Sequence, residues 1–176
     1  MSSREALRAF QARLAARLQE AQASGVAASW LAVEAGATRL LLPLSHAGEI
    51  FAHRAWHRVP YSKDWFLGVV NLRGGLLGVV DLAGFLDLAH SGQRDAAGLT
   101  ASRLVSLNPL FEMHCALLVD RLLGLRTVGA FVRSRPAQDG TPSYFGPVFT
   151  DGQGLDWQEI NLQTLSQLPA FLSIGV

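Results

Sequence analysis

Cysteine is nearly absent from this chain of 176 residues, which contains one, Cys115. A single cysteine excludes an intrachain disulfide, so the class of secreted domains held together by disulfides loses its main support. Cys115 begins the apolar run 115–119, where we expect a small buried hydrophobic side chain rather than a catalytic thiolate. His114 is the only base beside it in the sequence.

Charge is scarce and almost balanced. Charged residues make up 16% of the chain, and 15 basic against 14 acidic residues give a net charge of +1. Because binding to phosphates needs clustered positive charge, this balance argues against a broad nucleic-acid surface. One cluster could make a smaller surface: Arg54, Trp56, His57 and Arg58. A small β-barrel module that binds single-stranded nucleic acid therefore stays as the alternative function.

Long uncharged hydrophobic runs are missing as well. The most hydrophobic stretch, 65–88, contains Asn71, Arg73, Asp81 and Asp87. Each charge at the centre of a bilayer costs about 3 kcal/mol, so we expect no direct membrane insertion. The first residues carry dispersed charges and lack the apolar core of about 7–15 residues that marks a signal peptide. We therefore expect a cytoplasmic protein.

The chain also lacks the motifs of common catalytic and metal sites. It has no phosphate-binding loop and no Gly-x-Ser-x-Gly nucleophile elbow. His53 and His57 could share a metal on a helix, but no third ligand lies at a motif spacing. Asp81 and Asp120 each follow an apolar strand, where a lone Asp usually accepts backbone N–H bonds. We expect no enzymatic activity, no metal and no cofactor.

An N-terminal extension over residues 1–25 is expected to contain one amphipathic helix, residues 3–23. Its apolar positions recur at steps of three and four residues: Leu7, Phe10, Leu14 and Leu18. This stripe can pack on its own domain, dock on a partner or pair with a second copy of the chain.

Residues 26–176 have the pattern of a mainly β domain. Strand pairs are expected at residues 30–35 with 39–44, 66–72 with 76–82, and 147–150 with 155–160. Single strands are expected at residues 48–53, 103–107, 114–120 and 131–135, with loops over 53–64 and 90–100. Asn161 can cap a short C-terminal helix over 162–168, which Pro169 ends.

The clearest hairpin turns at Arg73-Gly74-Gly75. Its strands are almost continuously apolar, which indicates that both faces are covered. At the turn, the planar fork of Arg73 suits contact with a partner's carboxylate or carbonyls, or it ties the turn to a neighbouring strand. Segments 76–86 and 115–125 also resemble each other, since each strand ends in Val-Asp before an apolar, Gly-containing segment. This echo favours two related β lobes.

Segment 68–82, with Asn-Leu-Arg-Gly-Gly near its centre and Val-Asp-Leu at its end, resembles the signature of CheW-like domains. Leu-Pro-Leu at 42–44, Glu-Ile at 49–50 and Val-Pro at 59–60 fit the positions before that signature. The motif at 119–125 resembles the family's second-lobe motif. The N-terminal helix and the residues flanking the signature are most similar to the type IV pilus branch, the PilI-like coupling proteins of twitching motility.

The resemblance implies two SH3-like, five-stranded β-barrel lobes, with an N-terminal helix and a short C-terminal helix added. It also implies an adaptor without activity of its own in a chemosensory pathway. Such an adaptor couples the cytoplasmic tips of methyl-accepting chemoreceptors to the regulatory domain of a CheA-type histidine kinase. The kinase- and receptor-binding positions would be Glu49, Ile50, Gly68, Asn71, Leu72, Arg73, Gly74, Asp120, Leu122 and Leu125. Gly78 departs from the family, which commonly has Pro there.

Overall fold

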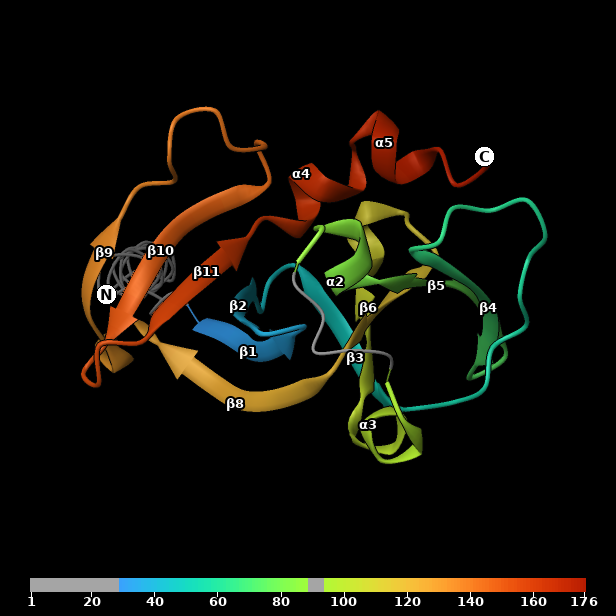
Figure 1. Ribbon diagram of the computed structural model, residues 1–176, viewed down its shortest axis with the longest axis horizontal. Helices are drawn as coiled ribbons and strands as arrows, with labels where there is room; N and C mark the ends of the chain where they lie inside the picture. Colours follow the sequence, from blue (N-terminus) through green and yellow to red (C-terminus); the bar gives the residue numbers. More distant parts are fainter. Residues whose placement is uncertain (1–28, 89–93) are drawn as a thin grey trace, which may run out of the picture.

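Two β-sheets form most of the protein in the computed structural model, which describes residues 29–88 and 94–176 (Figure 1). The prediction of a mainly β fold is confirmed over these residues. The sheets contain six and five strands, whereas the resemblance implied two lobes of five strands each. The helix predicted over residues 3–23 and the boundary at residue 25 lie outside the described residues.

The six-stranded sheet has the strand order β8-β1-β2-β11-β10-β9. Its strands are β1 (Ser29–Ala35), β2 (Thr38–Pro43), β8 (Arg121–Thr127), β9 (Phe131–Arg135), β10 (Phe145–Asp151) and β11 (Asp156–Ile160). The five-stranded sheet has the order β3-β6-β7-β5-β4. Its strands are β3 (Ala47–Ala52), β4 (Phe66–Leu72), β5 (Gly75–Asp81), β6 (Arg103–Leu107) and β7 (Cys115–Val119). The short helices are α2 (Leu82–Phe85), α3 (Ala96–Ala101), α4 (Leu162–Ser166) and α5 (Pro169–Leu172).

The chain builds the five-stranded sheet as an insertion in the six-stranded one. β1 and β2 belong to the six-stranded sheet, β3 to β7 form the whole of the other sheet, and β8 to β11 complete the first. β2 and β11 make the junction between the early and late strands, and they run parallel, with Leu40 opposite Gln158. The two lobes are therefore not consecutive segments of the sequence.

The central strands are buried on both faces, which explains their almost continuous apolar sequence. On β1, Leu31 and Val33 face a large core to which both sheets contribute, whereas Trp30 and Ala32 face a smaller core of the six-stranded sheet. The five-stranded sheet has its own second cluster, which includes Val70. α2, α4 and α5 pack on the large core, at the junction of the two sheets (Figure 1).

The hairpin of β4 and β5 confirms the predicted turn between adjacent antiparallel strands. Leu72 lies opposite Gly75, so the turn consists of Arg73 and Gly74. Both have positive φ angles, 50° and 79°, as a two-residue hairpin turn matched to the strand twist requires. The side-chain oxygen of Asn71 accepts a hydrogen bond from the Gly74 N–H at 3.0 Å. The Asn-Leu-Arg-Gly sequence thus specifies the turn locally.

The echo between segments 76–86 and 115–125 does not mark two lobes, and that interpretation is wrong. The two echoing strands are β5 and β7, which lie side by side and parallel in the same five-stranded sheet. Val80 lies opposite Leu117, and Asp81 lies opposite Leu118. The repeated Val-Asp ending instead places two carboxylates near one edge of one sheet.

Several short elements depart from the predicted pattern. β8 was not predicted, because Gly124 has a φ of 90° and the pairing with β1 shifts register, which interrupts the period of two. α3 lies within the segment 90–100 that was predicted as a loop, and the side chain of Asp95 caps it. Asn161 caps α4 as predicted, but Pro169 begins the further helix α5.

Candidate interaction site

The turn of the signature hairpin carries an exposed ion pair. Nη1 of Arg73 lies 3.0 Å from Oε2 of Glu49, and the two side chains are 76% and 55% exposed. The Arg73 guanidinium also lies 5.9 Å from the centre of the Phe51 ring. β3 and β4 are the opposite edges of the five-stranded sheet, so the pair joins its two edges. An ion pair this exposed contributes at most about 1 kcal/mol to stability. Because its side chain is exposed, Arg73 is accessible to a partner.

An apolar groove of about 360 Å³ lies beside this ion pair. Phe51, Leu72 and Leu77 contribute apolar surface, and Pro109 and Met113 extend the groove toward β7. Arg73 and Glu49 line it as well, so the groove combines an apolar floor with a charged rim. That composition suits the binding of a partner side chain, because interfaces commonly pair an apolar centre with polar edges.

The remaining signature residues differ in exposure. Ile50 is exposed and, as the neighbour of Glu49 in β3, points to the opposite face of the strand. Asn71 is exposed, but its side-chain oxygen is engaged by the turn. Gly74 is open to solvent, and a Cβ there would meet nothing within 4 Å. Leu72 is buried in the core of its own sheet, so it shapes the groove from below.

Gly68 is required by a close backbone approach. Its φ is 139°, and a Cβ would lie 2.1 Å from the carbonyl oxygen of His57. His57 exchanges two backbone hydrogen bonds with Val69, at 2.8 and 2.9 Å, so the loop after β3 pairs with the edge strand β4. Gly68 is buried, and its position indicates a role in closing this edge of the sheet rather than a direct contact.

A half-buried ion-pair cluster that was not predicted joins the two sheets. Arg94 donates from Nη1 and Nη2 to both carboxylate oxygens of Asp81, at 3.0 and 2.9 Å, and from Nε to Asp120. The other oxygen of Asp120 accepts from the Gly36 N–H at 2.6 Å, in the turn between β1 and β2. We call these three charged side chains the Arg94 cluster. It ties the ends of β5 and β7 to a turn of the six-stranded sheet.

The Arg94 cluster refines what was expected of the two aspartates. Asp120 accepts a backbone N–H as predicted, but Asp81 bonds to the guanidinium through both oxygens. Burial by itself lowers the pKa of Arg94, and the hydrogen bonds to Asp81 and Asp120 outweigh it, so the net shift is upward and the group stays charged. The structure therefore holds Asp120, one of the expected binding positions, inside a structural cluster.

The two leucines of the second motif lie on β8, an edge strand of the six-stranded sheet. Leu122 packs against the large core, opposite Val33, whereas Leu125 lies opposite Leu31 and is 63% exposed. Among the residues that the structure describes, β8 is an edge strand and presents Leu125 there. This apolar position and the groove beside Arg73 lie on different sheets.

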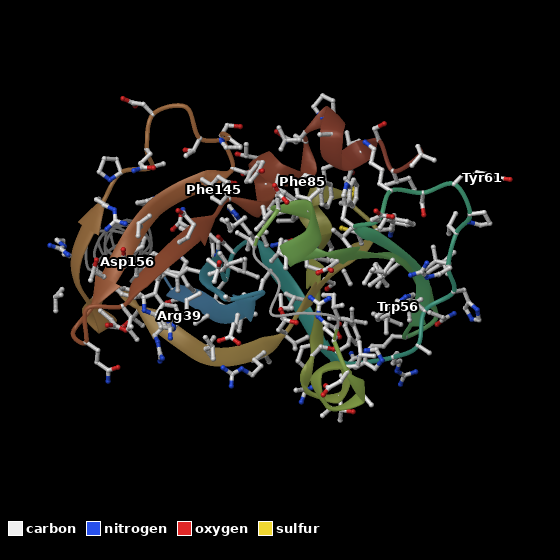
Figure 2. All side chains as sticks on the ribbon, in the orientation of Figure 1. Arg39, Trp56, Tyr61, Phe85, Phe145 and Asp156 are labelled. Carbon is white, nitrogen blue, oxygen red and sulfur yellow. The ribbon has the colours of Figure 1, made fainter. Side chains whose placement is uncertain are left out.

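Two other expectations concern reactive and nucleic-acid-binding residues. Cys115 is buried, and burial raises the pKa of its thiol to about 12, so the sulfur is a neutral packing group. Trp56 is partly buried against the core of the five-stranded sheet, with its ring 5.3 Å from that of His53 (Figure 2). Its ring is therefore engaged by the core and by His53, and only part of it is accessible to a base.

Within residues 29–88 and 94–176, no helix is long and apolar enough to cross a membrane. Across the same residues, no three His, Cys, Asp or Glu side chains gather closely enough to hold a metal ion.

The comparison with known families agrees with the family that the signature turn predicts. The model of the CheW-like domain matches residues 29–169, and the chain belongs to this family. The predicted family is thereby confirmed.

Among the proteins that resemble the chain are one curated relative and one solved structure. Protein PilI from Pseudomonas aeruginosa is 27% identical over 167 residues, which cover 93% of this chain and 89% of that protein. The crystal structure of the scaffolding protein TtCheW from Thermoanaerobacter tengcongensis superposes with a TM-score of 0.63. That likeness covers 81% of this chain and 94% of the other at 15% identity, and it supports the fold alone.

Proposed function

We propose that this chain is a coupling protein that joins methyl-accepting chemoreceptors to a CheA-type histidine kinase in a pathway that controls type IV pili. Membership of the CheW-like family supports the coupling role, and the similarity to PilI along 93% of the chain supports the pilus branch. We also propose that its two sheets are the SH3-like lobes of that family. The protein would be cytoplasmic and would reach receptor arrays through its partners.

The exposed pair of Arg73 and Glu49 beside an apolar groove is the observation that carries this proposal. Arg73 has donors left over after its contact with Glu49, because a guanidinium carries five N–H groups. A partner carboxylate or a row of carbonyls can accept them, while an apolar partner side chain enters the groove. Asn71 and Gly74 would widen this surface, whereas Ile50 lies on the opposite face of β3.

A coupling protein needs two surfaces held in a fixed relation, and the fold provides candidates for both. One is the groove beside Arg73 on the five-stranded sheet, and the other is the β8 edge with Leu125 on the six-stranded sheet. Gly68 would stabilise the edge of the five-stranded sheet, and the Arg94 cluster would fix the position of one sheet relative to the other. Such an adaptor does no chemistry, since it acts by placing the kinase beside the receptor.

Assembly with receptor and kinase tests the proposal. Arg73→Ala should leave the melting temperature within a few degrees of wild type, because the pair is exposed. It should weaken co-sedimentation with receptor and kinase by about 2 kcal/mol or more, and Arg73→Lys should recover only part of this. Arg135→Ala is the matched control, since it removes an ion pair with Asp156 that is also about half exposed.

Exchange of the two charges separates a binding role from a structural one. If the pair acts as an internal tie, the double variant Arg73→Glu with Glu49→Arg restores both stability and assembly. If Arg73 contacts a partner, the exchanged pair restores stability but not assembly, because the partner meets the wrong charge. Full assembly by Arg73→Ala, or equal losses in the Arg135 control, would count against the proposed surface.

A further inference from the structure

A second hollow, of about 470 Å³, opens on the six-stranded sheet, away from the signature hairpin. Its lining comes from β1, β2, β8, β11 and the turn between β10 and β11. Charged side chains dominate it: Glu34, Arg39, Arg121, Arg126 and Asp151. Arg39 can be followed in Figure 2, beside β1 and β2. Of these residues only Arg121 lies in a motif that resembles the family's, the one at 119–125.

Two arginines of this hollow cover one tryptophan. The guanidinium carbon of Arg126 lies 5.3 Å from the ring centre of Trp157, and that of Arg39 lies 6.0 Å from it. Trp157 is 4% exposed and belongs to the smaller core of the six-stranded sheet, and the two arginines lie over its ring. β11 pairs with β2 next to Arg39, and β8 brings Arg126 from the other side of β1. The fold thus brings two cations together over one apolar ring.

The carboxylates in the hollow are already engaged. Glu34 accepts from Arg121 with both oxygens, at 3.1 and 2.9 Å. Asp151 accepts two backbone N–H groups and, at 3.0 Å, the indole N–H of Trp157.

Arg39 and Arg126, in contrast, have no hydrogen bond or ion pair with any side chain or backbone group that the structure describes, although Arg39 lies near enough to Asp151 to help lower the pKa of that carboxyl. Both side chains are half-buried. Two such cations repel one another and have lost part of their hydration, so an anion placed between them is favoured.

We propose that this hollow, the Trp157 hollow, binds a carboxylate from an acidic segment of a partner protein through Arg39 and Arg126. Each guanidinium can offer a planar pair of N–H donors to a carboxylate. The flanking carboxylates of Glu34 and Asp151 disfavour a long polyanion such as nucleic acid, whereas a single carboxylate meets less of this repulsion. The buried Trp157 ring has no free face for a base. The inference does not depend on the proposed function.

Calorimetry with the full chain and a short oligoglutamate peptide tests this, with an oligoglutamine peptide of equal length as the uncharged probe. The glutamate peptide should bind and the glutamine peptide should not. Arg39→Gln and Arg126→Gln should each weaken binding at least about tenfold, and Arg126→Lys should weaken it less. Arg133→Gln is the matched control, since it removes one exposed positive charge from β9 outside the hollow. It should bind like wild type.

Other outcomes would overturn the proposal. An equal loss with Arg133→Gln would mean that only net charge attracts the peptide. Binding of inorganic phosphate or of an oligonucleotide at the same arginines, as tightly as the peptide, would assign a different ligand. Thermal unfolding of each variant is measured in parallel. If the Gln variants unfold earlier and no wild-type peptide binding is found, the arginines only cap Trp157.

Discussion

Removal of Arg94 should destabilise the whole protein, although its side chain comes from a polar segment beside a short helix. Arg94→Ala would leave Asp81 without its two hydrogen bonds, while Asp120 would keep the bond from Gly36. The side chains of Arg94, Asp81 and Asp120 are 17%, 12% and 21% exposed, so water can replace only part of what is lost. Two negative charges would then remain close to the junction of the sheets.

The expected loss follows from this burial. Breaking a buried ion pair by removing one partner costs about 3–5 kcal/mol, and we expect the lower end, about 3 kcal/mol, because some water reaches the site. For a chain of this size, each kcal/mol lowers the melting temperature by roughly 2–4 °C. Arg94→Ala should therefore melt roughly 6–12 °C below wild type. Arg135→Ala, at its exposed ion pair, should cost at most about 1 kcal/mol.

A double-mutant cycle with Asp81→Asn identifies the cause. Denaturant unfolding of the two single variants and of the combined variant should give a coupling energy of about 1–3 kcal/mol, because the amide removes the charge that Arg94 neutralised. A melting temperature of Arg94→Ala within about 2 °C of wild type would refute the reasoning, since it would mean that the cluster behaves as an ordinary surface pair.

Two further predictions concern Gly68 on β4 and Cys115 on β7, both in the five-stranded sheet. Gly68→Ala should destabilise the protein by at least about 2 kcal/mol in urea unfolding, because the new Cβ meets a carbonyl at a strained φ, whereas Gly152→Ala, with nothing within 4 Å, should be neutral. Burial raises the pKa of Cys115 from 9.0 to about 12. The stability that the neutral thiol contributes is therefore fully present below pH 9, and it is lost as the pH rises through about 12. At pH 8 the native thiol should resist alkylation until urea unfolds the chain, and equal rates in both states would contradict its burial.

The parts of the fold that were predicted correctly have local causes. The turn at Arg73 and Gly74 is specified by the side chain of Asn71 and by the small residues beside it, all within four positions. The cap of α4 by Asn161 is likewise local, as its oxygen accepts from a backbone N–H three residues later. These features depend on few residues, so a sequence pattern can contain them.

The parts that could not be predicted depend on residues far apart in the chain. Arg94 bonds to Asp81 and Asp120, which are 13 and 26 positions away, and no spacing rule joins them. The parallel junction of β2 with β11 links strands separated by most of the chain, so the six-stranded sheet could not be inferred from hairpins. The repeated Val-Asp was the available signal for the cluster, since it places both carboxylates at the ends of adjacent strands.

The insertion of one sheet within the other sets an order for folding on the ribosome. The strands of the five-stranded sheet, β3 to β7, leave the ribosome as one continuous stretch of chain. This lobe can therefore form while the chain is still growing. The hairpin of β1 and β2 is synthesised before those strands, but its neighbours β8 and β11 are synthesised after them. Until then its apolar edges stay open to wrong partners, and a nascent chain stopped after β7 would expose them permanently.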